Sequence, residues 1–397
     1  MTNPLTIRLE TGNLHLELKP GRVPIHRLLG FAARISSKRK FLLVSKVLGK
    51  HYPVTPQMMA WSYRALAKMA MIYDPSASSL WIGMAETATG LGYGVYAAAC
   101  EQGLQNGLFM QTTRYHLAGG EYLAFDEAHS HATDFFLYYP EQADLRQRFL
   151  TAQTLVLIDD EISTGRTFLR LIEAYQAVNS ALKTVLIVSL VNFAAAEHRQ
   201  RLTTETGIDV QWLSLREGQL RFDDANNAEL DAQTVNVSSN SVCKRSLLGW
   251  PGRLGITAPI ELTEATIDEA LQWLPVNDDT RPLLVLGTGE CNAPAYLLGR
   301  ALELRGFCVK VQSTTRSPIH LGNSIEAICQ FEDNYGDGIV NFLYNLNSDA
   351  YRAIVLCHET PLNPALLDRL HAWQALGARF ELNTNDLNHA TLHFFRP

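Results

Sequence analysis

The sequence predicts an α/β protein with two domains, each built on a mainly parallel sheet, the second smaller than the first. Apolar runs of strand length alternate with helical patterns along most of the chain, which is typical of parallel sheets with helices on both faces. The alternation stops at residues 226–261, which are rich in Asp, Asn, Ser, Gly and Pro, and then resumes. With 397 residues, each part is long enough to bury its own core. We therefore expect a domain at 1–225, a polar linker at 226–261 and a domain at 262–397.

Composition and charge describe an ordinary globular protein. Hydrophobic residues make up 47% of the chain, and the net charge is −6, which argues against nucleic acid as a partner. No apolar run could span a bilayer and no signal-peptide core begins the chain, so we expect a cytoplasmic protein without a membrane partner. Six cysteines without a C-x-x-C pair argue against structural zinc and a disulfide framework.

The first 75 residues are predicted to form a hairpin, a further strand and a helix. Residues 5–18 alternate like two strands around a Thr-Gly-Asn turn, and the apolar run at 41–44 is the further strand. The pattern over 56–73 is helical, with Thr55 as N-cap and Pro56 at the first helical position.

Two basic groups precede this helix. Residues 34–40, RISSKRK, are expected to form a solvated surface, and a contact with polynucleotide is the less favoured alternative. Lys50 and His51 follow a glycine. They could bind an anion, but a surface position is the favoured interpretation.

Residues 79–101 combine a strand, a loop of small residues and a helix. The strand is predicted at 80–84, the loop at 85–90 and the helix at 91–100. Small residues let the backbone approach a ligand closely, as a phosphate-binding loop requires.

The most informative stretch is 154–169, TLVLIDDEISTGRTFL. A strand buried on both faces ends at Asp159 and Asp160, and residues 163–167 make a tight turn into a helix. Such a junction directs backbone N–H groups and the positive end of the helix dipole to one point, which forms an anion site. The two carboxylates can accept hydrogen bonds from a diol or face a hydrated divalent cation. Together these groups suggest that the ligand is a phosphorylated ribose.

Strand and helix patterns continue on both sides of this stretch. We expect helices at 141–150 and 194–202 and strands at 183–192 and 208–215, and we expect residues 214–222 to fold back as a hairpin across a Glu-Gly turn. Ligands of such sheets bind at the carboxyl ends of the strands, where the loops at 85–90 and 163–167 are predicted to lie.

The stretch 154–169 resembles the phosphoribosyl-pyrophosphate (PRPP) signature of type I phosphoribosyltransferases: an apolar strand, an acidic pair and a Thr-Gly turn. A P-loop is the main competitor, but its spacing and its lysine are missing. The resemblance implies a type I phosphoribosyltransferase-like sheet and a glycosyltransferase (pentosyltransferase) that uses Mg²⁺. It assigns PRPP binding to Asp159, Asp160, Ser163, Thr164, Gly165, Arg166 and Thr167, with Asp159 and Asp160 also contacting Mg²⁺ through water.

The same resemblance places a pyrophosphate loop at Ala85, Glu86, Thr87, Ala88 and Thr89. Glu86 departs from the family pattern, because many members carry a basic residue there. A carboxylate beside pyrophosphate is repulsive unless a magnesium ion lies between them.

Residues 112–134 have the length and position of the flexible loop that closes over PRPP in this fold and excludes water from the reacting centre. Arg114 could neutralise pyrophosphate as the bond breaks. Glu127, His129 and His131 are candidates for proton transfer or magnesium contact. A zinc site and a plain surface loop are the alternatives.

The second unit repeats the strand and helix pattern in a smaller, Rossmann-like form. Helices are expected at 263–273, 294–306 and 364–376, and strands at 282–286, 307–312, 354–357 and 378–382. The loop Gly287, Thr288, Gly289 and Glu290 is a weak phosphate-loop signal.

The run Thr315, Arg316, Ser317, Pro318 resembles the TRSP domain, which is named for that sequence. This domain follows a divergent phosphoribosyltransferase domain in proteins encoded in bacterial tellurite-resistance and stress-response gene clusters. Arg316 is a reasonable anion ligand at a strand end. We count Thr315, Arg316 and Ser317, with the 287–290 loop, as second-domain site candidates.

The resemblance predicts PRPP-dependent phosphoribosyl transfer, or its reverse, on a nucleobase-like acceptor in a nucleoside-like metabolite pathway. Hypoxanthine or guanine is disfavoured, since Ser163 stands where enzymes of 6-oxopurines carry an aspartate base. The competing hypothesis is a catalytically inactive protein that senses PRPP or a nucleotide. The expected partners are PRPP or a ribonucleotide and the acceptor, and a homodimer is compatible with either hypothesis.

Overall fold

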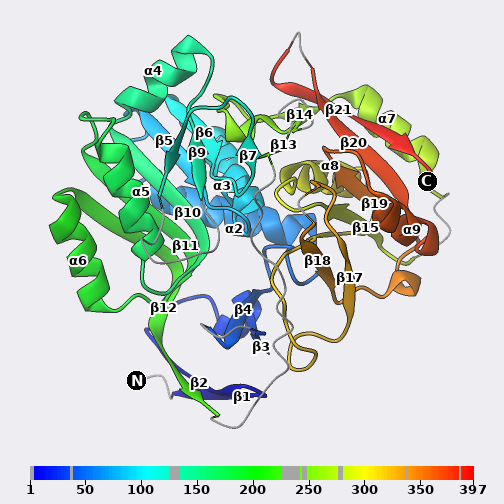
Figure 1. Ribbon diagram of the computed structural model, residues 1–397, viewed down its shortest axis with the longest axis horizontal. Helices are drawn as coiled ribbons and strands as arrows, with labels where there is room; N and C mark the ends of the chain where they lie inside the picture. Colours follow the sequence, from blue (N-terminus) through cyan, green and yellow to red (C-terminus); the bar gives the residue numbers. More distant parts are fainter. Residues whose placement is uncertain are drawn as a thin grey trace.

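The computed structural model describes residues 4–35, 39–125, 135–225, 242–243, 248–275, 280–336, 338–383 and 386–397. It contains two large sheets that lie side by side, each with helices against it (Figure 1). The predicted α/β class with a second α/β unit is therefore confirmed. Within the described residues, no helix is both long enough and apolar enough to cross a bilayer.

The first sheet has seven strands in the order β1-β2-β12-β11-β10-β5-β6. Its five central and edge strands from β12 to β6 run parallel, and β1 and β2 form the predicted antiparallel hairpin. The strands are β1 (Leu5–Leu9), β2 (Gly12–Leu18), β5 (Ser79–Gly83), β6 (Gly107–Gln111), β10 (Thr154–Ile162), β11 (Thr184–Asn192) and β12 (Asp209–Asp224).

The predicted hairpin across Glu217 and Gly218 is wrong. Residues 209–224 form one strand, β12, which pairs with β11 in parallel up to Glu217 and with β2 antiparallel from Gly218 onward. The Glu-Gly pair therefore marks a change of partner and not a turn. The far N-terminal hairpin supplies that partner, which the local pattern of residues 214–222 does not reveal.

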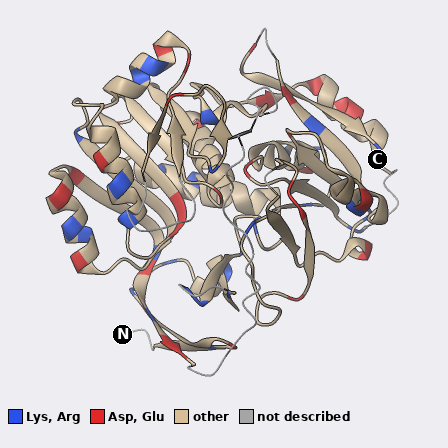
Figure 2. Cartoon of the chain, viewed as in Figure 1, with Lys and Arg blue, Asp and Glu red and all other residues tan. Residues whose placement is uncertain are grey.

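Helices cover both faces of the first sheet. In Figure 1, α5 and α6 lie on the outer face, while α2 and α3 lie between the two sheets. Charges of both signs lie side by side on α5 and α6 (Figure 2), so the electrostatic potential of this face has no single sign. The helices are α2 (Pro56–Ala70), α3 (Thr89–Glu101), α4 (Ala143–Thr151), α5 (Arg166–Gln176) and α6 (Ala196–Thr206).

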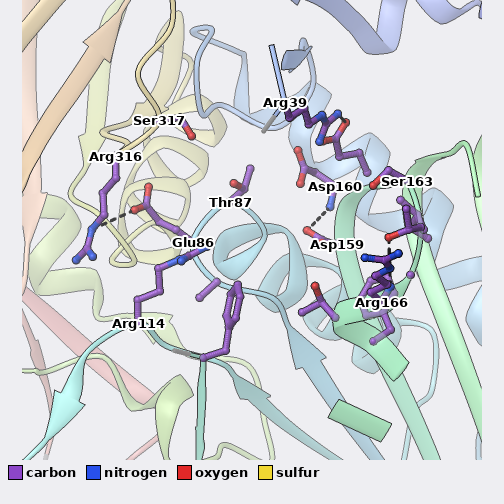
Figure 3. A pocket seen from close by; sticks show the side chains of 18 of the residues that line it. Arg39, Glu86, Thr87, Arg114, Asp159, Asp160, Ser163, Arg166, Arg316 and Ser317 are labelled. Atoms are coloured by element: carbon purple, nitrogen blue, oxygen red, sulfur yellow. Dashed lines mark hydrogen bonds and ion pairs between the residues drawn. The ribbon is translucent and has the colours of Figure 1, made fainter. Parts of the chain in front are cut away.

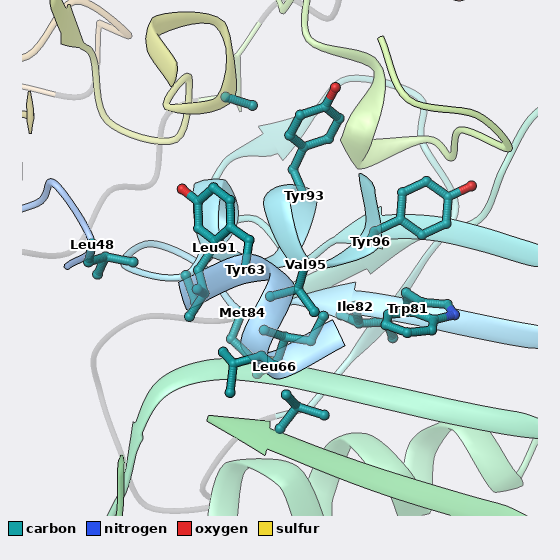
Figure 4. Close-up of a cluster of buried hydrophobic side chains, with 14 of the residues drawn as sticks. Leu48, Tyr63, Leu66, Trp81, Ile82, Met84, Leu91, Tyr93, Val95 and Tyr96 are labelled. Carbon is teal, nitrogen blue, oxygen red and sulfur yellow. The ribbon is translucent and has the colours of Figure 1, made fainter. Parts of the chain in front are cut away.

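Close packing of α3 fixes the loop that precedes it. A Cβ at Gly94 would lie 2.2 Å from the Tyr63 ring of α2, and one at Gly92 would lie 2.4 Å from the Cα of Gly83 in β5. Aromatic and aliphatic side chains fill the remaining space between these elements (Figure 4). The start of α3, and with it the loop at 85–88, is therefore held rigidly against the sheet.

The second sheet has six strands in the order β14-β21-β20-β19-β15-β16. The strands and helices predicted between 263 and 382 are present, whereas the edge strands β14 and β21 were not foreseen. These elements are β14 (Glu261–Leu262), α7 (Glu264–Trp273), β15 (Leu283–Gly287), α8 (Ala293–Leu304), β16 (Val309–Ser313), β19 (Ala353–His358), α9 (Pro364–Ala372), β20 (Leu376–Leu382) and β21 (His389–Phe395).

Shorter elements complete the described structure. They are the helix α1 (Ile25–Leu28) and the strand pairs β3 (Leu29–Ala33) with β4 (Phe41–Ser45), β8 (Tyr122–Ala124) with β9 (Phe136–Tyr138), β7 (His116–Leu117) with β13 (Val242–Cys243), and β17 (Ile328–Glu332) with β18 (Val340–Tyr344). Backbone bridges join the two halves of the chain at Arg34 with Ile319 and at Val54 with Val311. The hairpin β3–β4 thus lies against both large units.

Candidate functional site

One cavity collects most of the side chains that the sequence singled out. Its volume is about 370 Å³. Figure 3 shows Asp159, Asp160, Ser163 and Arg166 on one side of it, facing Glu86, Arg114 and Arg316. The lining residues are Arg34, Arg39, Ala85, Glu86, Thr87, Arg114, Phe135, Asp159, Asp160, Glu161, Ile162, Ser163, Thr164, Gly165, Arg166, Thr167, Phe168, Thr315, Arg316 and Ser317.

The junction of β10 and α5 has the form of an anion site. Gly165 is the N-cap of α5 and has a φ of 74°, the left-handed conformation that glycine adopts without strain. A Cβ there would also lie 3.1 Å from Trp212. The first turn of α5, which begins at Arg166, therefore opens toward the cavity with its N–H groups and its dipole.

Asp159 and Asp160 form a half-buried acidic pair near the carboxyl end of β10, two residues before the strand ends at Ile162. The Asp160 N–H donates to Oδ1 of Asp159 at 2.9 Å. Burial and the charge of Asp160 raise the pKa of Asp159 well above its usual range, and burial and the charge of Glu161 raise the pKa of Asp160 to about 7. Crowded carboxylates of this kind favour a bound cation or a hydroxyl donor.

This donor set fits Mg²⁺ held partly through water. Oxygen ligands from one or two carboxylates are what Mg²⁺ uses when a phosphate supplies the rest of its shell. Among the described residues, no group of three His, Cys, Asp or Glu side chains is arranged to hold a metal directly. Asp159 and Asp160 would therefore hold the ion together with a substrate.

Two residues of the basic cluster at 34–40, Arg34 and Arg39, do not lie on the solvated face that we predicted. Arg39 forms a two-point ion pair with Glu161, with Nη2 to Oε2 at 3.0 Å, and Arg34 lines the same cavity. Arg34 and Arg39 lie beside β3 and β4, whose pairing turns them inward. Charge counting alone could not find them, because their orientation depends on a strand pairing.

Glu86 is buried between two cations. Its Oε1 lies 2.8 Å from Nζ of Lys50, and its Oε2 lies 3.5 Å from Nε of Arg316. Burial alone would raise the pKa of Glu86, but the charges of Lys50 and Arg316 hold it below its usual value. The carboxylate in the predicted pyrophosphate loop is therefore neutralised by the protein itself.

The surface position predicted for Lys50 and His51 is wrong. Lys50 is only 1% exposed and also donates to the carbonyl of Gly289 at 3.1 Å. His51 is 3% exposed, and burial lowers its pKa to about 3. Both residues therefore support the cavity wall from behind. Of the loop 85–89, only Ala85, Glu86 and Thr87 line the cavity, because Ala88 and Thr89 already belong to the start of α3.

Arg114 lines the cavity with its guanidinium 4.3 Å from the Phe135 ring centre. Its backbone is fixed by the second unit, since Oε1 of Glu290 accepts the Arg114 N–H at 2.8 Å and Oε2 accepts the Thr113 hydroxyl at 2.6 Å. Burial lowers the pKa of Arg114. The other three candidates of this loop, Glu127, His129 and His131, lie outside the described residues.

The second-domain candidates separate into two groups. Thr315, Arg316 and Ser317 line the cavity opposite β10, whereas the loop Gly287, Thr288, Gly289 and Glu290 does not. Thr288 and Glu290 are at most 1% exposed, and the Gly289 N–H donates to the Thr314 hydroxyl at 2.8 Å. The 287–290 loop therefore fixes the neighbouring segments and does not face the cavity.

A buried ion-pair network clamps the two units together behind the cavity. Nε of Arg253 lies 3.1 Å from Glu290, and its two terminal nitrogens lie 2.8 and 3.0 Å from Glu359. The Tyr335 hydroxyl donates to Glu359 at 3.0 Å, and the Tyr335 ring stacks on Tyr115 at 4.2 Å. Because every charge in this network has a partner, the relative position of the two units is well defined.

Two protein-family models match parts of this chain. A family model described as "Phosphoribosyl transferase" matches residues 28–219, and one described as "TRSP domain C terminus to PRTase_2" matches residues 250–373. No curated protein matches the chain significantly.

Solved structures similar to part of the chain include two adenine phosphoribosyltransferases. The protein from Trypanosoma brucei is 14% identical, with 48% of this chain and 77% of that chain covered and a TM-score of 0.34. The protein from Rhodothermus marinus is also 14% identical, with 48% and 96% covered and a TM-score of 0.33. The two family models thus identify a domain of the phosphoribosyl transferase family at residues 28–219, followed by a TRSP domain at residues 250–373.

Proposed function

We propose that the cavity transfers a 5-phosphoribosyl group between PRPP and a nucleobase-like acceptor, and that both domains build the site. The observation that carries this proposal is the shared cavity, in which the β10–α5 junction faces Glu86, Arg114 and Arg316. A sugar phosphate and a pyrophosphate need two separate anion sites, and the cavity has one on each side.

In this proposal the 5-phosphate binds the turn 163–167 and the first N–H groups of α5. Asp159 and Asp160 accept hydrogen bonds from the ribose hydroxyls and hold Mg²⁺, which would neutralise their charge and that of the pyrophosphate when bound. Thr87 and Arg114 bind the pyrophosphate. The charges of Lys50 and Arg316 offset Glu86, so the loop does not repel the leaving group.

The reaction forms a bond from an acceptor ring nitrogen to C1 and breaks the bond from C1 to the pyrophosphate oxygen. The pyrophosphate leaves with the bonding electrons and takes up the proton that the ring nitrogen loses. Positioning and charge stabilisation then supply most of the catalysis, so the cavity's own residues suffice for this class of reaction.

Isotope exchange tests the proposal. Purified protein with Mg²⁺, labelled pyrophosphate and PRPP should incorporate label into PRPP in the presence of a suitable base and its nucleotide. The control is Asp160→Asn, which should lose exchange. Exchange that is unaffected by this substitution would contradict the assignment of the site.

A catalytically inactive PRPP or nucleotide sensor is the second candidate. The buried pairing of Glu86 with Lys50 and Arg316 favours it, because part of the loop's charge is used inside the protein. Calorimetric binding of PRPP without any exchange across a panel of bases would select this function. For either function we propose a setting in cytoplasmic nucleotide metabolism linked to stress or tellurite resistance.

A further inference from the structure

One wall of the cavity has no role in the proposed reaction. It consists of Arg34, Thr315 and Ser317, which belong neither to the turn 163–167 nor to the loop 85–87. Arg34 is the informative member. Its Nε is buried without a hydrogen-bond partner, and no ion pair with any described residue involves its side chain.

Three of the other four arginines that line the cavity differ from Arg34 in having a partner for their charge. Arg39 is paired with Glu161 and Arg316 with Glu86, while Arg114 stacks on Phe135. Burial and the charge of Arg39 lower the pKa of Arg34, and the nearby Glu161 carboxylate, which pairs with Arg39, offsets this only in part. A half-buried guanidinium without an ion pair of its own costs free energy unless a ligand supplies the missing anion.

The backbone holds Arg34 next to the TRSP run. The Ile35 N–H donates to the Pro318 carbonyl at 3.2 Å, and the His320 N–H donates to the Ala33 carbonyl at 3.0 Å. The Ser317 N–H donates to the Thr315 hydroxyl at 3.2 Å, which keeps this turn compact. Arg34 and the two hydroxyl residues therefore form one fixed surface made by both domains.

We propose that this surface binds the acceptor and that the acceptor carries a carboxylate, which pairs with the Arg34 guanidinium. The inference rests on the proposed function and extends it to the class of acceptor. In a displacement at C1, the acceptor nitrogen approaches C1 from one side and the pyrophosphate leaves from the other. Since the loop 85–87 and Arg114 take the pyrophosphate, the remaining wall is left for the acceptor. A guanidinium recognises a carboxylate through two parallel hydrogen bonds, which selects it against a neutral amide.

Matched pairs of heterocycles test the inference. Orotate with uracil and nicotinate with nicotinamide each share a ring and differ in the carboxylate. Affinities are measured by calorimetry on the full-length protein saturated with PRPP and Mg²⁺. We expect at least one carboxylate to bind about 10-fold to 100-fold more tightly than its neutral partner, the range of a charge-assisted hydrogen bond. In Arg34→Gln this preference should fall to near parity, and Arg34→Lys should restore part of it.

The control variant is Arg201→Gln, which removes an exposed ion pair with Glu205 on α6 and should keep the preference of the native chain. PRPP affinity is measured on the same variants. A larger loss for PRPP than for the carboxylate in Arg34→Gln would show that Arg34 binds pyrophosphate, and this would overturn the inference. Equal affinities within both pairs in the native chain would overturn it as well. Failure of the native chain to bind PRPP would instead remove the proposed function.

Discussion

Nε of Arg316, in the TRSP run of the second domain, lies 3.5 Å from Oε2 of Glu86, in the loop after β5 of the first domain. The same carboxylate is bound by Lys50, and the Arg316 guanidinium also lies 4.7 Å from the Tyr115 ring centre. The sequence that names the second domain is thus part of the wall of the first domain's cavity. The TRSP domain therefore contributes lining residues to a cavity that the first domain of the same chain begins.

Lys50→Met should destabilise the protein strongly. It leaves Glu86 buried with only the more distant Arg316 as partner, and breaking a buried pair on one side costs about 3–5 kcal/mol. Chemical denaturation would measure this loss in the free energy of unfolding. The double variant Lys50→Met, Glu86→Gln should recover part of it, because no buried carboxylate then lacks its lysine, although Arg316 also loses its partner. A double variant less stable than Lys50→Met would contradict the pairing.

Asp160→Asn should weaken PRPP binding about 10-fold to 100-fold, because the amide cannot replace a carboxylate that accepts from a hydroxyl and faces Mg²⁺. Calorimetry with PRPP and Mg²⁺ measures the change. Asp268→Asn, at an exposed side chain of α7, is the matched control. Equal affinities of the two variants would remove Asp160 from the site.

The ligand-free protein should lose stability as the pH rises from about 4 to about 7. Burial and neighbouring carboxylates raise the pKa of Asp159 and Asp160 above the ordinary value near 3.9. In this window the folded pair keeps a proton that the unfolded chain has lost, so deprotonation favours unfolding. Thermal denaturation at several pH values should show a shallower decline in Asp160→Asn. Added Mg²⁺ with PRPP should stabilise most above pH 7, and a native chain without this decline would contradict the raised pKa values.

Glu290→Gln should impair catalysis although Glu290 does not line the cavity. Its carboxylate accepts hydrogen bonds from the Thr113 hydroxyl and the Arg114 backbone N–H, so its loss should let the Arg114 side chain move away from the proposed pyrophosphate site. We expect kcat/KM for PRPP to fall about tenfold, the effect of one misplaced charged hydrogen bond. Affinity for ribose 5-phosphate, which has no pyrophosphate, should change much less. An equal loss of affinity for PRPP and for ribose 5-phosphate would indicate general unfolding. Glu332→Gln, at an exposed position of β17, is the control.

Several parts of the fold could be read from the sequence because they depend on neighbours in the chain. The junction of β10 and α5 follows from an apolar run, a glycine and a helical pattern within sixteen residues, and Thr55 caps α2 as predicted, accepting from the Met58 N–H at 3.3 Å. The alternation of strands and helices likewise fixed the α/β class. Local steric and hydrogen-bonding preferences decide these features.

The charges of the site could not be read in this way. Lys50 and Glu86 are 36 residues apart, Glu86 and Arg316 are 230 apart, and no local pattern links them. The sequence by itself determined most of the elements and the place where the sugar phosphate is expected to bind. Only the tertiary structure decided that Arg34, Arg39 and Lys50 face inward. It also decided that β12 changes partner at Gly218 and that the 287–290 loop does not line the cavity. The physical reason is that burial and ion pairing depend on which distant segments meet, and long-range packing sets this.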